Sequence, residues 1–192
     1  MHEKWRYNIR LAWKRNVKTS WVDPTPDVID IWMSLLDDTT SRDGFTHNAR
    51  EYYISFLQNL RDNNAWGMLF ATYEGQVIAA GIFVYHHGIA IYYYGASASD
   101  WELRRHMAPY LIQWEAMREG KMRGCSTYDF LGIAPPGEIN HPLAWVTSFK
   151  EKFGWNIVQI GSKRYYILSY ISYGIFVTSR YLKRIFMRLS WR

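Results

Sequence analysis

The sequence predicts an α+β domain built on a mixed, mostly antiparallel sheet flanked by helices. Three apolar runs in the middle of the chain, WGMLFATY, VIAAGIFVY and IAIYYYG, are separated by the short turns EGQ and HHG. This pattern is typical of a three-stranded antiparallel meander. The segments on either side carry apolar residues at helical spacing instead. A chain of 192 residues with no internal repeat fits one domain with a substantial core.

The N-terminal part is expected to form a helix, a strand and two further helices. A basic helix is predicted over residues 3–16, and VKTSWV (17–22) has the composition of a strand. Thr25 and Pro26 predict the start of the next helix, because threonine caps a helix and proline is favoured at its first position. A further helix is predicted at about 48–63, where apolar side chains recur at helical spacing.

The part after the meander is expected to alternate between helix and strand. Ser99 or Asp100 is predicted to cap one long helix over about 101–123. The remaining elements are a strand at 126–133, a loop at PPGEINHP, a short helix at LAWVTSFKEKF, two strands at NIVQI and RYYIL, and a final helix. The expected organisation is a basic leading helix at 1–16, a domain at 17–170 and a basic amphipathic helix at 171–192.

This order of elements resembles the GNAT acyltransferase fold, in which the fourth and fifth strands splay apart and an acyl donor enters the gap. In typical GNAT enzymes, a glycine-rich turn after the fourth strand binds the pyrophosphate of acetyl-CoA through backbone N–H groups. Here the same place reads YYYGASASDWELRR, where Asp100 would compete with a phosphate for those groups. The sequence therefore predicts a GNAT-like scaffold without the usual CoA-binding turn, a different acyl donor and no bound cofactor.

Charge and composition limit the class of partner. The net charge of +6 and the pI of about 9.4 favour an anionic partner, such as nucleic acid, a phosphorylated substrate or an acidic membrane surface. Cys125 is the only cysteine, so a disulfide framework and a cysteine-based zinc site are excluded, and a cytoplasmic location is expected. No segment has the apolar length of a membrane span. His86 and His87 are adjacent in a hairpin turn and are interpreted as turn residues, so no metal site is expected.

Six motifs in order resemble the FemABX (Fem-type) aminoacyltransferases. They are RYNIRLAWKRNV, RDGFTHNAREYY, YYYGASAS, APYLIQWEAM, YDFLGI and HPLAWVTSFKEKFG, and the resemblance covers about residues 4–170. Members of that family usually carry two GNAT-like domains. This chain resembles the second domain with the helix that leads into it, which implies a missing N-terminal GNAT-like domain as a partner.

The resemblance implies a reaction in the synthesis of the peptidoglycan cell wall. Fem-type enzymes take glycine, alanine or serine from an aminoacyl-tRNA and attach it to a stem-peptide amine of a peptidoglycan precursor, either UDP-linked or lipid-linked, at the inner face of the plasma membrane. The reaction is the aminolysis of an ester. It needs both substrates in position, and positive charge or hydrogen-bond donors where the oxyanion develops. It needs no metal.

Lys150 and Phe149 are the first candidate site residues. By resemblance, this pair lies where the 3′ end of the tRNA enters, with Lys150 near phosphate or developing negative charge and Phe149 against the terminal adenine. The alternative for Lys150 is a solvated charge that interacts with the dipole at a helix C-terminus. Lys152 is assigned to that alternative.

Asp129 and Tyr94 are two further candidates, and for each we keep two interpretations. Asp129 would orient or deprotonate the attacking amine, or else cap a neighbouring loop or pair with an arginine. Tyr94 resembles a family tyrosine that contacts the precursor, or else is one of three consecutive tyrosines that simply faces outward.

The segment RDGFTHNAREYY departs from the family pattern. Some members bind substrate phosphate with an arginine and a tyrosine, which correspond here to Asn48 and Tyr52. Asn48 cannot neutralise a phosphate, so Arg50 or His47 is considered as its substitute. Two tryptophans, Trp145 and Trp155, also stand where the family commonly has glycine, and they either narrow the donor channel or lie outside it.

The end of the chain predicts a basic amphipathic helix. Its apolar stripe is Leu182, Ile185, Phe186 and Leu189, and its basic residues are Arg180, Arg184, Arg188 and Arg192. Such a helix binds anionic lipid or RNA phosphates, or packs its stripe on the domain. Two rival functions stay open at this point: an acyl-CoA-dependent GNAT N-acyltransferase, and a non-catalytic tRNA- or membrane-binding remnant.

Overall fold

The computed structural model describes residues 3–138, 141, 143–154, 156–159 and 166–189, and for residues 183–189 it describes the backbone alone. The chain divides into two compact units, Met1–Trp155 and Asn156–Arg192. We call them the main unit and the C-terminal unit and treat each by itself.

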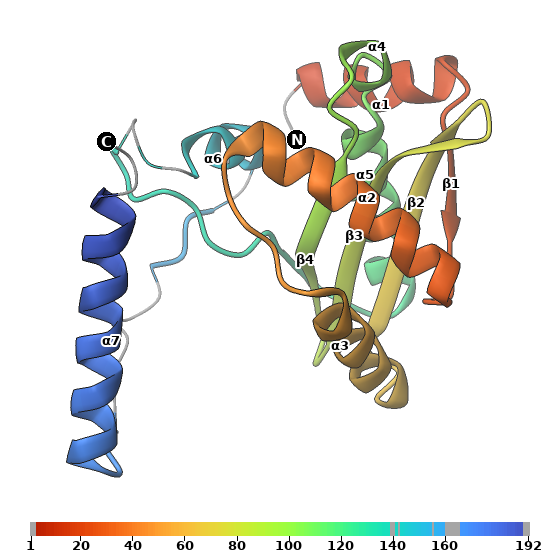
Figure 1. Cartoon of the computed structure of the whole chain (residues 1–192). Coiled ribbons are helices and arrows are strands. Elements are labelled where there is room, and N and C mark those ends of the chain that lie inside the picture. The colour runs from red at the N-terminus through yellow and green to blue at the C-terminus, as the bar shows by residue number, and fades with distance from the viewer. Residues whose placement is uncertain (1–2, 139–140, 142, 155, 160–165, 190–192) are drawn as a thin grey trace. The chain divides into compact units, whose positions relative to one another are not determined.

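The main unit contains a five-stranded mixed sheet (Figure 1). Its strands follow one another in chain order across the sheet: β1 (Lys18–Trp21), β2 (Trp66–Tyr73), β3 (Gln76–His86), β4 (Ile89–Ser97) and β5 (Thr127–Asp129). The first three pairings are antiparallel, and only β5 runs parallel to β4. The predicted meander is β2, β3 and β4, and the predicted fold class is confirmed.

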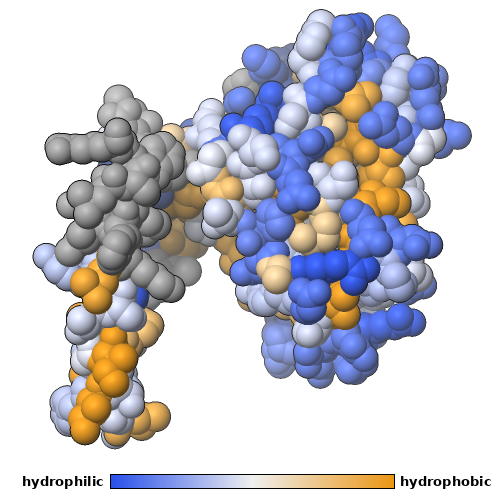
Figure 2. Space-filling model, in the orientation of Figure 1, coloured by the Kyte–Doolittle hydropathy of each residue, from blue (hydrophilic) through white to orange (hydrophobic). Residues whose placement is uncertain are grey.

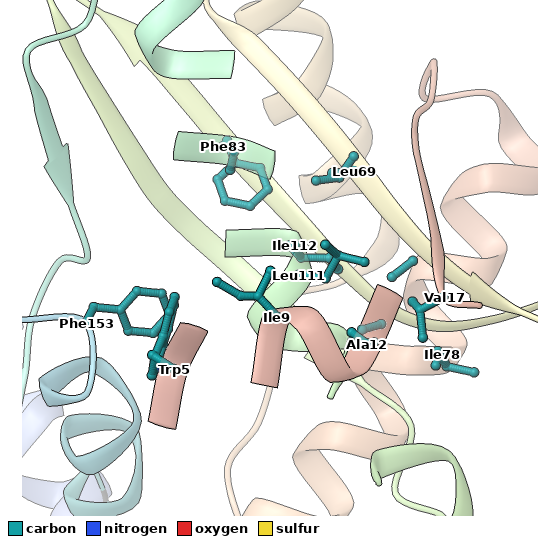
Figure 3. Packing of buried hydrophobic residues seen from close by; sticks show 14 of the residues in the cluster. Trp5, Ile9, Ala12, Val17, Leu69, Ile78, Phe83, Leu111, Ile112 and Phe153 are labelled. Carbon is teal, nitrogen blue, oxygen red and sulfur yellow. The ribbon is translucent and has the colours of Figure 1, made fainter. Parts of the chain in front are cut away.

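Helices cover both faces of this sheet (Figure 1). On one face lie α2 (Pro26–Asp43) and α3 (Arg50–Asp62), whose apolar side chains form a core with Met68, Phe70 and Ile82. On the other face α1 (Glu3–Lys14) packs against α5 (Ala108–Met122). The side chains of this second core interlock around Ile9, Leu111 and Ile112 (Figure 3).

The helix predicted over 101–123 is divided, so that prediction is wrong in its extent. It consists of α4 (Trp101–Arg104) and α5, which are separated at Met107 in the left-handed conformation (φ 58°). The cause is Pro109, which lacks an N–H group and is tolerated only in the first turn of a helix. The predicted cap is present, because the Asp100 carboxylate accepts a hydrogen bond from the Glu102 N–H at 2.8 Å.

The segment after the main unit differs from the prediction of two more strands. Residues 156–159 and 166–168 have no regular structure, and residues 160 and 164–165 lie outside the described part of the chain. The final helix forms as α7 (Tyr170–Leu189). Figure 2 shows apolar side chains along its visible face, and its exposed apolar residues include Ile171, Ile175, Phe176, Val177 and Leu182.

The basic stripe predicted for this helix is described only in part. Arg180 and Leu182 are exposed, whereas the side chains of residues 183–192 lie outside the described set. None of the described helices has both the length and the hydropathy that crossing a bilayer requires.

Candidate functional site

The strands β4 and β5 separate after a short parallel pairing. They pair only at Ile89 with Thr127, Ala90 with Tyr128 and Ile91 with Asp129. The Asp129 carboxylate then accepts a hydrogen bond from the N–H of Leu131 at 2.7 Å, and Leu131 adopts a left-handed conformation (φ 58°) that turns the chain away from β4. Residues 92–97, which we call the open edge of β4, have no strand partner on this side within the described part of the chain.

A cavity of about 980 Å³ lies along the open edge of β4. Its walls come from both faces of the sheet, because it reaches from the end of α2 to the short helix α6 (Ala144–Glu151). Residues on the α2 side are Thr39, Arg42, His47, Asn48 and Tyr53, and residues on the α5 side are Ile112, Gln113, Phe130, Phe149 and Lys150. Two substrates that approach from opposite faces would therefore meet at the edge of one strand.

A β-bulge at Tyr93 divides the three consecutive tyrosines of β4 between the two faces. The register changes from Ile82 opposite Tyr94 to Phe83 opposite Tyr92, which leaves Tyr93 as the extra residue. As a result, Tyr92 packs on the core beneath α5 and Tyr94 packs on the core beneath α2 and α3. Without the bulge, the period of two would place both side chains on one face.

Lys150 is a buried cation in the cavity wall. Lys150 is only 6% exposed, and its Nζ donates a hydrogen bond to the carbonyl oxygen of Gly132 at 2.7 Å. Burial lowers the pKa of Lys150 to about 8, and the charge of Asp129 opposes that shift. The side chain is therefore held against the turn that follows β5, and it is not a solvated charge at a helix end.

This burial predicts a pH-dependent stability. The pKa of Lys150 is about 8 in the folded chain and 10.5 ordinarily, so the unfolded chain binds more protons between these values. The unfavourable contribution of Lys150 is full below pH 8 and lost above pH 10.5, and the free energy of unfolding rises by about 3 kcal/mol across that window. Urea unfolding of the wild type and of Lys150→Met at pH 7.5 and pH 10 tests this. An equal difference between the two proteins at both pH values would contradict it.

Phe149 belongs to an aromatic cluster at the cavity wall. Its ring centroid lies 5.4 Å from that of Tyr110 and 5.3 Å from that of Phe153, in edge-to-face arrangements. Phe149 is half-buried and lines the cavity, so one part of the ring packs in the core and another part faces the cavity. Asp129 is outside the residues that line the cavity, and its carboxylate is engaged by the Leu131 N–H.

Tyr94 and Tyr52 meet at the α3 side of the sheet. Their hydroxyl oxygens lie 3.1 Å apart, and burial raises the pKa of Tyr94. Tyr94 lines the cavity, whereas Tyr52 is 40% exposed and stacks its ring on Phe56. The structure thus brings together two of the predicted substrate-binding residues.

Asn48 and His47 reach the cavity, but Arg50 does not. The Arg50 Nε forms an ion pair with Asp30 of α2 at 2.7 Å. The imidazole of His47 contacts the Asp37 carboxylate at 2.7 Å, and its pKa is raised, mainly by the hydrogen bond to the Asn48 carbonyl. Of the two substitutes considered for the phosphate-binding arginine, only His47 is placed to contact a ligand in the cavity.

The cavity lining also includes Arg42, Tyr92 and Gln113, which the sequence analysis did not single out. The Arg42 guanidinium pairs with Asp43 and donates to the carbonyl oxygens of Ser97 and Ala98, both at 3.2 Å. Trp145 also lines the cavity, whereas Trp155 lies outside the described residues. No cluster of His, Cys, Asp or Glu among the described residues is arranged to bind a metal ion.

Comparison with known proteins identifies the family. The profile of the FemAB family matches residues 62–176, more than half of the sequence. The chain belongs to the FemAB family. A search of curated proteins finds no significant match.

Solved structures place this FemAB chain in the GNAT-like fold. A crystal structure of FemX is 16% identical with a TM-score of 0.73, and the match covers 80% of this chain and 54% of FemX. The chain thus spans about half the length of FemX. Two acetyltransferases match over 99% of their own length: an aminoglycoside 6'-N-acetyltransferase from Acinetobacter haemolyticus (14% identity, 79% of this chain, TM-score 0.55) and a possible acetyltransferase from Clostridium difficile (10%, 80%, TM-score 0.58). At these identities the likeness shows the fold alone.

The turn after β4 in this FemAB chain differs from a pyrophosphate-binding turn. The Asp100 carboxylate already accepts from a backbone N–H at the start of α4, and α4 is only four residues long. An anion at this place would meet a carboxylate of the same charge, which is unfavourable. This geometry favours a scaffold without the usual CoA-binding turn, which stays a prediction.

Proposed function

We propose that this FemAB chain is the catalytic half of a tRNA-dependent aminoacyltransferase. It would add glycine, alanine or serine to a stem-peptide amine of a peptidoglycan precursor, UDP-linked or lipid-linked, together with a second GNAT-like domain. The observation that carries the proposal is the buried Lys150 ammonium in the wall of a cavity along the open edge of β4.

The cavity supports a reaction between two large substrates. The aminoacyl ester of the tRNA enters from the α6 side, where Phe149 faces the cavity, and the acceptor amine approaches from the α2 side, where Tyr94 and Asn48 line it. The reacting atoms then meet at the open edge of β4. Holding both reactants in this way removes much of the entropic barrier to a bimolecular reaction.

Lys150 stabilises negative charge in this proposal. Attack of the amine on the ester carbonyl produces an oxyanion, and a buried ammonium interacts with it more strongly than a solvated one. We assign Asp129 a positioning role, because its carboxylate fixes the turn that presents the Gly132 carbonyl to Lys150. Tyr52 would contact the precursor through the hydroxyl that meets Tyr94.

The partners follow from the same reaction. The net charge of +6 favours aminoacyl-tRNA and an anionic membrane surface, and a cytoplasmic enzyme at the inner face of the plasma membrane would reach a lipid-linked precursor. The exposed apolar residues of α7, with Arg180 in the same helix, suit contact with such a surface.

A transfer assay separates this proposal from its rivals. The chain is incubated with glycyl-, alanyl- or seryl-tRNA and a lysine-containing precursor, with and without the first domain of a two-domain FemAB protein, and in parallel with acetyl-CoA. We expect an aminoacylated precursor and no acetylated product. Acetyl transfer would favour an acyl-CoA N-acyltransferase. Binding of tRNA or anionic vesicles without transfer under either condition would favour a non-catalytic remnant.

A further inference from the structure

Three polar side chains, those of Tyr128, Gln113 and Tyr92, lie together on the α5 side of the sheet, and Gln113 and Tyr92 line the cavity. The Tyr128 hydroxyl donates to the Oε1 of Gln113 at 2.6 Å. Gln113 is only 1% exposed, and its side-chain amide faces the Tyr92 hydroxyl, whose pKa it lowers. Since Oε1 is the acceptor for Tyr128, the amide N–H of Gln113 is the group that faces the Tyr92 hydroxyl.

This arrangement limits the direction of the Tyr92 hydroxyl hydrogen. A phenol has one O–H donor, and the group of Gln113 that faces its oxygen is itself a donor. The Tyr92 O–H therefore points to an acceptor other than Gln113. Burial raises the pKa of Tyr92 to about 12, so the group stays protonated at neutral pH and remains a donor.

The Tyr92 hydroxyl lies at the open edge of β4. Its ring packs between Phe83, at 5.6 Å between centroids, and Phe130, at 6.4 Å. The hydroxyl oxygen lies so close over Gly95 that a Cβ added there would be 1.6 Å away. Gly95 also lines the cavity, and any other residue at position 95 would displace the hydroxyl.

We propose that Tyr92 is a catalytic residue whose O–H donates a hydrogen bond to the acyl carbonyl oxygen of the donor ester, and that Gln113 is its positioning residue. The inference rests on the proposed function and adds, beside Lys150, a second group that stabilises the oxyanion. The amine nitrogen bonds to the carbonyl carbon, and the π electron pair moves to the oxygen that Tyr92 binds. When this tetrahedral intermediate collapses, the C–O bond to the ribose breaks. The proton that the amine releases reaches the ribose oxygen through solvent. Tyr92 keeps its own proton throughout.

The first test compares three variants in the transfer assay, with the first domain supplied where transfer requires it. Tyr92→Phe is expected to lower kcat by about 100-fold, since loss of one oxyanion donor has an effect of this order, and to leave KM for aminoacyl-tRNA within about threefold. Gln113→Met is expected to lower kcat by about 10-fold with KM unchanged, because the hydroxyl is present but no longer oriented. The matched control is Tyr85→Phe, which removes another buried hydroxyl, bonded to the Ala116 carbonyl and outside the cavity lining. Its kcat should equal that of the wild type.

A binding measurement provides a readout that does not depend on turnover. The probes are a phosphonate analogue of 3′-aminoacyl adenosine, which carries a tetrahedral anionic centre, and adenosine itself, both measured by calorimetry. Tyr92→Phe should bind the phosphonate at least about 10-fold more weakly and adenosine as tightly as the wild type.

The outcomes separate the two proposals. A wild type that transfers the aminoacyl group, with a Tyr92→Phe variant of equal kcat and equal phosphonate affinity, would overturn the role of Tyr92 and leave the proposed function standing. A wild type that neither transfers an aminoacyl group nor binds adenosine would overturn both.

Discussion

Replacement of Lys150 with methionine is expected to lower the rate of aminoacyl transfer by about 100-fold while the chain stays folded. The ammonium is held by the Gly132 carbonyl in the cavity wall, where the dielectric is low and a positive charge stabilises an oxyanion strongly. Methionine has a similar length and no charge, so it fills the same space. Because burial of the charged form is unfavourable, the variant should be at least as stable as the wild type at pH 7.

The measurement combines single-turnover transfer with thermal unfolding of the same samples. Lys121→Met is the matched control, since Lys121 is exposed near the end of α5 and outside the cavity lining. Its transfer rate and Tm should match the wild type. An unchanged rate in Lys150→Met would show that the buried ammonium has no part in the reaction. A lowered Tm in that variant would contradict the electrostatic argument.

The fold was predictable because most of its elements depend on local patterns. The meander follows from three apolar runs separated by short turns, and Pro26 and Asp100 mark helix starts that the structure contains. The division of the long helix could also have been predicted from Pro109, because a proline ring is tolerated only in the first turn of a helix. The expected strands at 156–160 and 164–168 had suitable composition, but strand formation depends on a partner that composition does not reveal.

The candidate site was less predictable because it depends on tertiary packing. The burial of Lys150 depends on where α6 meets the turn after β5, eighteen residues away in sequence. Tyr92 and Tyr94 lie on opposite faces only because of the bulge at Tyr93, which no residue type marks. The resemblance to the family predicted Lys150 and Tyr94, which line the cavity, and Tyr52, which lies outside its lining, whereas Tyr92 and Gln113 are recognised only in the structure.

The family profile begins at residue 62, although the first helix of the chain contributes to the same core. Trp5, Ile9 and Ala12 of α1 are buried, and Trp5 is completely inaccessible to solvent. Figure 3 shows Trp5 beside Phe153, and its ring also contacts Tyr110 and Phe149. The helix α1 therefore supports α6, which carries Lys150.

Trp5→Ala is consequently expected to lower the free energy of unfolding of the main unit by about 3 to 5 kcal/mol, the range for removal of a buried tryptophan. Trp5→Phe should be milder, because the Trp5 Nε1 is buried without a hydrogen-bond partner among the described residues, so its loss removes an unfavourable term. Urea unfolding followed by far-UV circular dichroism measures both variants.

Trp13→Ala is the control on the same helix, since Trp13 is 47% exposed, and its effect should stay within about 0.5 kcal/mol. Near-equal effects of Trp5→Ala and Trp13→Ala would contradict a structural role for α1. Because Trp5 also packs on Phe149, Trp5→Ala should release the Lys150 side chain from its buried position, and the rise in stability between pH 8 and pH 10.5 should become smaller in that variant. That coupling would connect the first helix of the chain, through one aromatic cluster, to the charge that the proposed reaction uses.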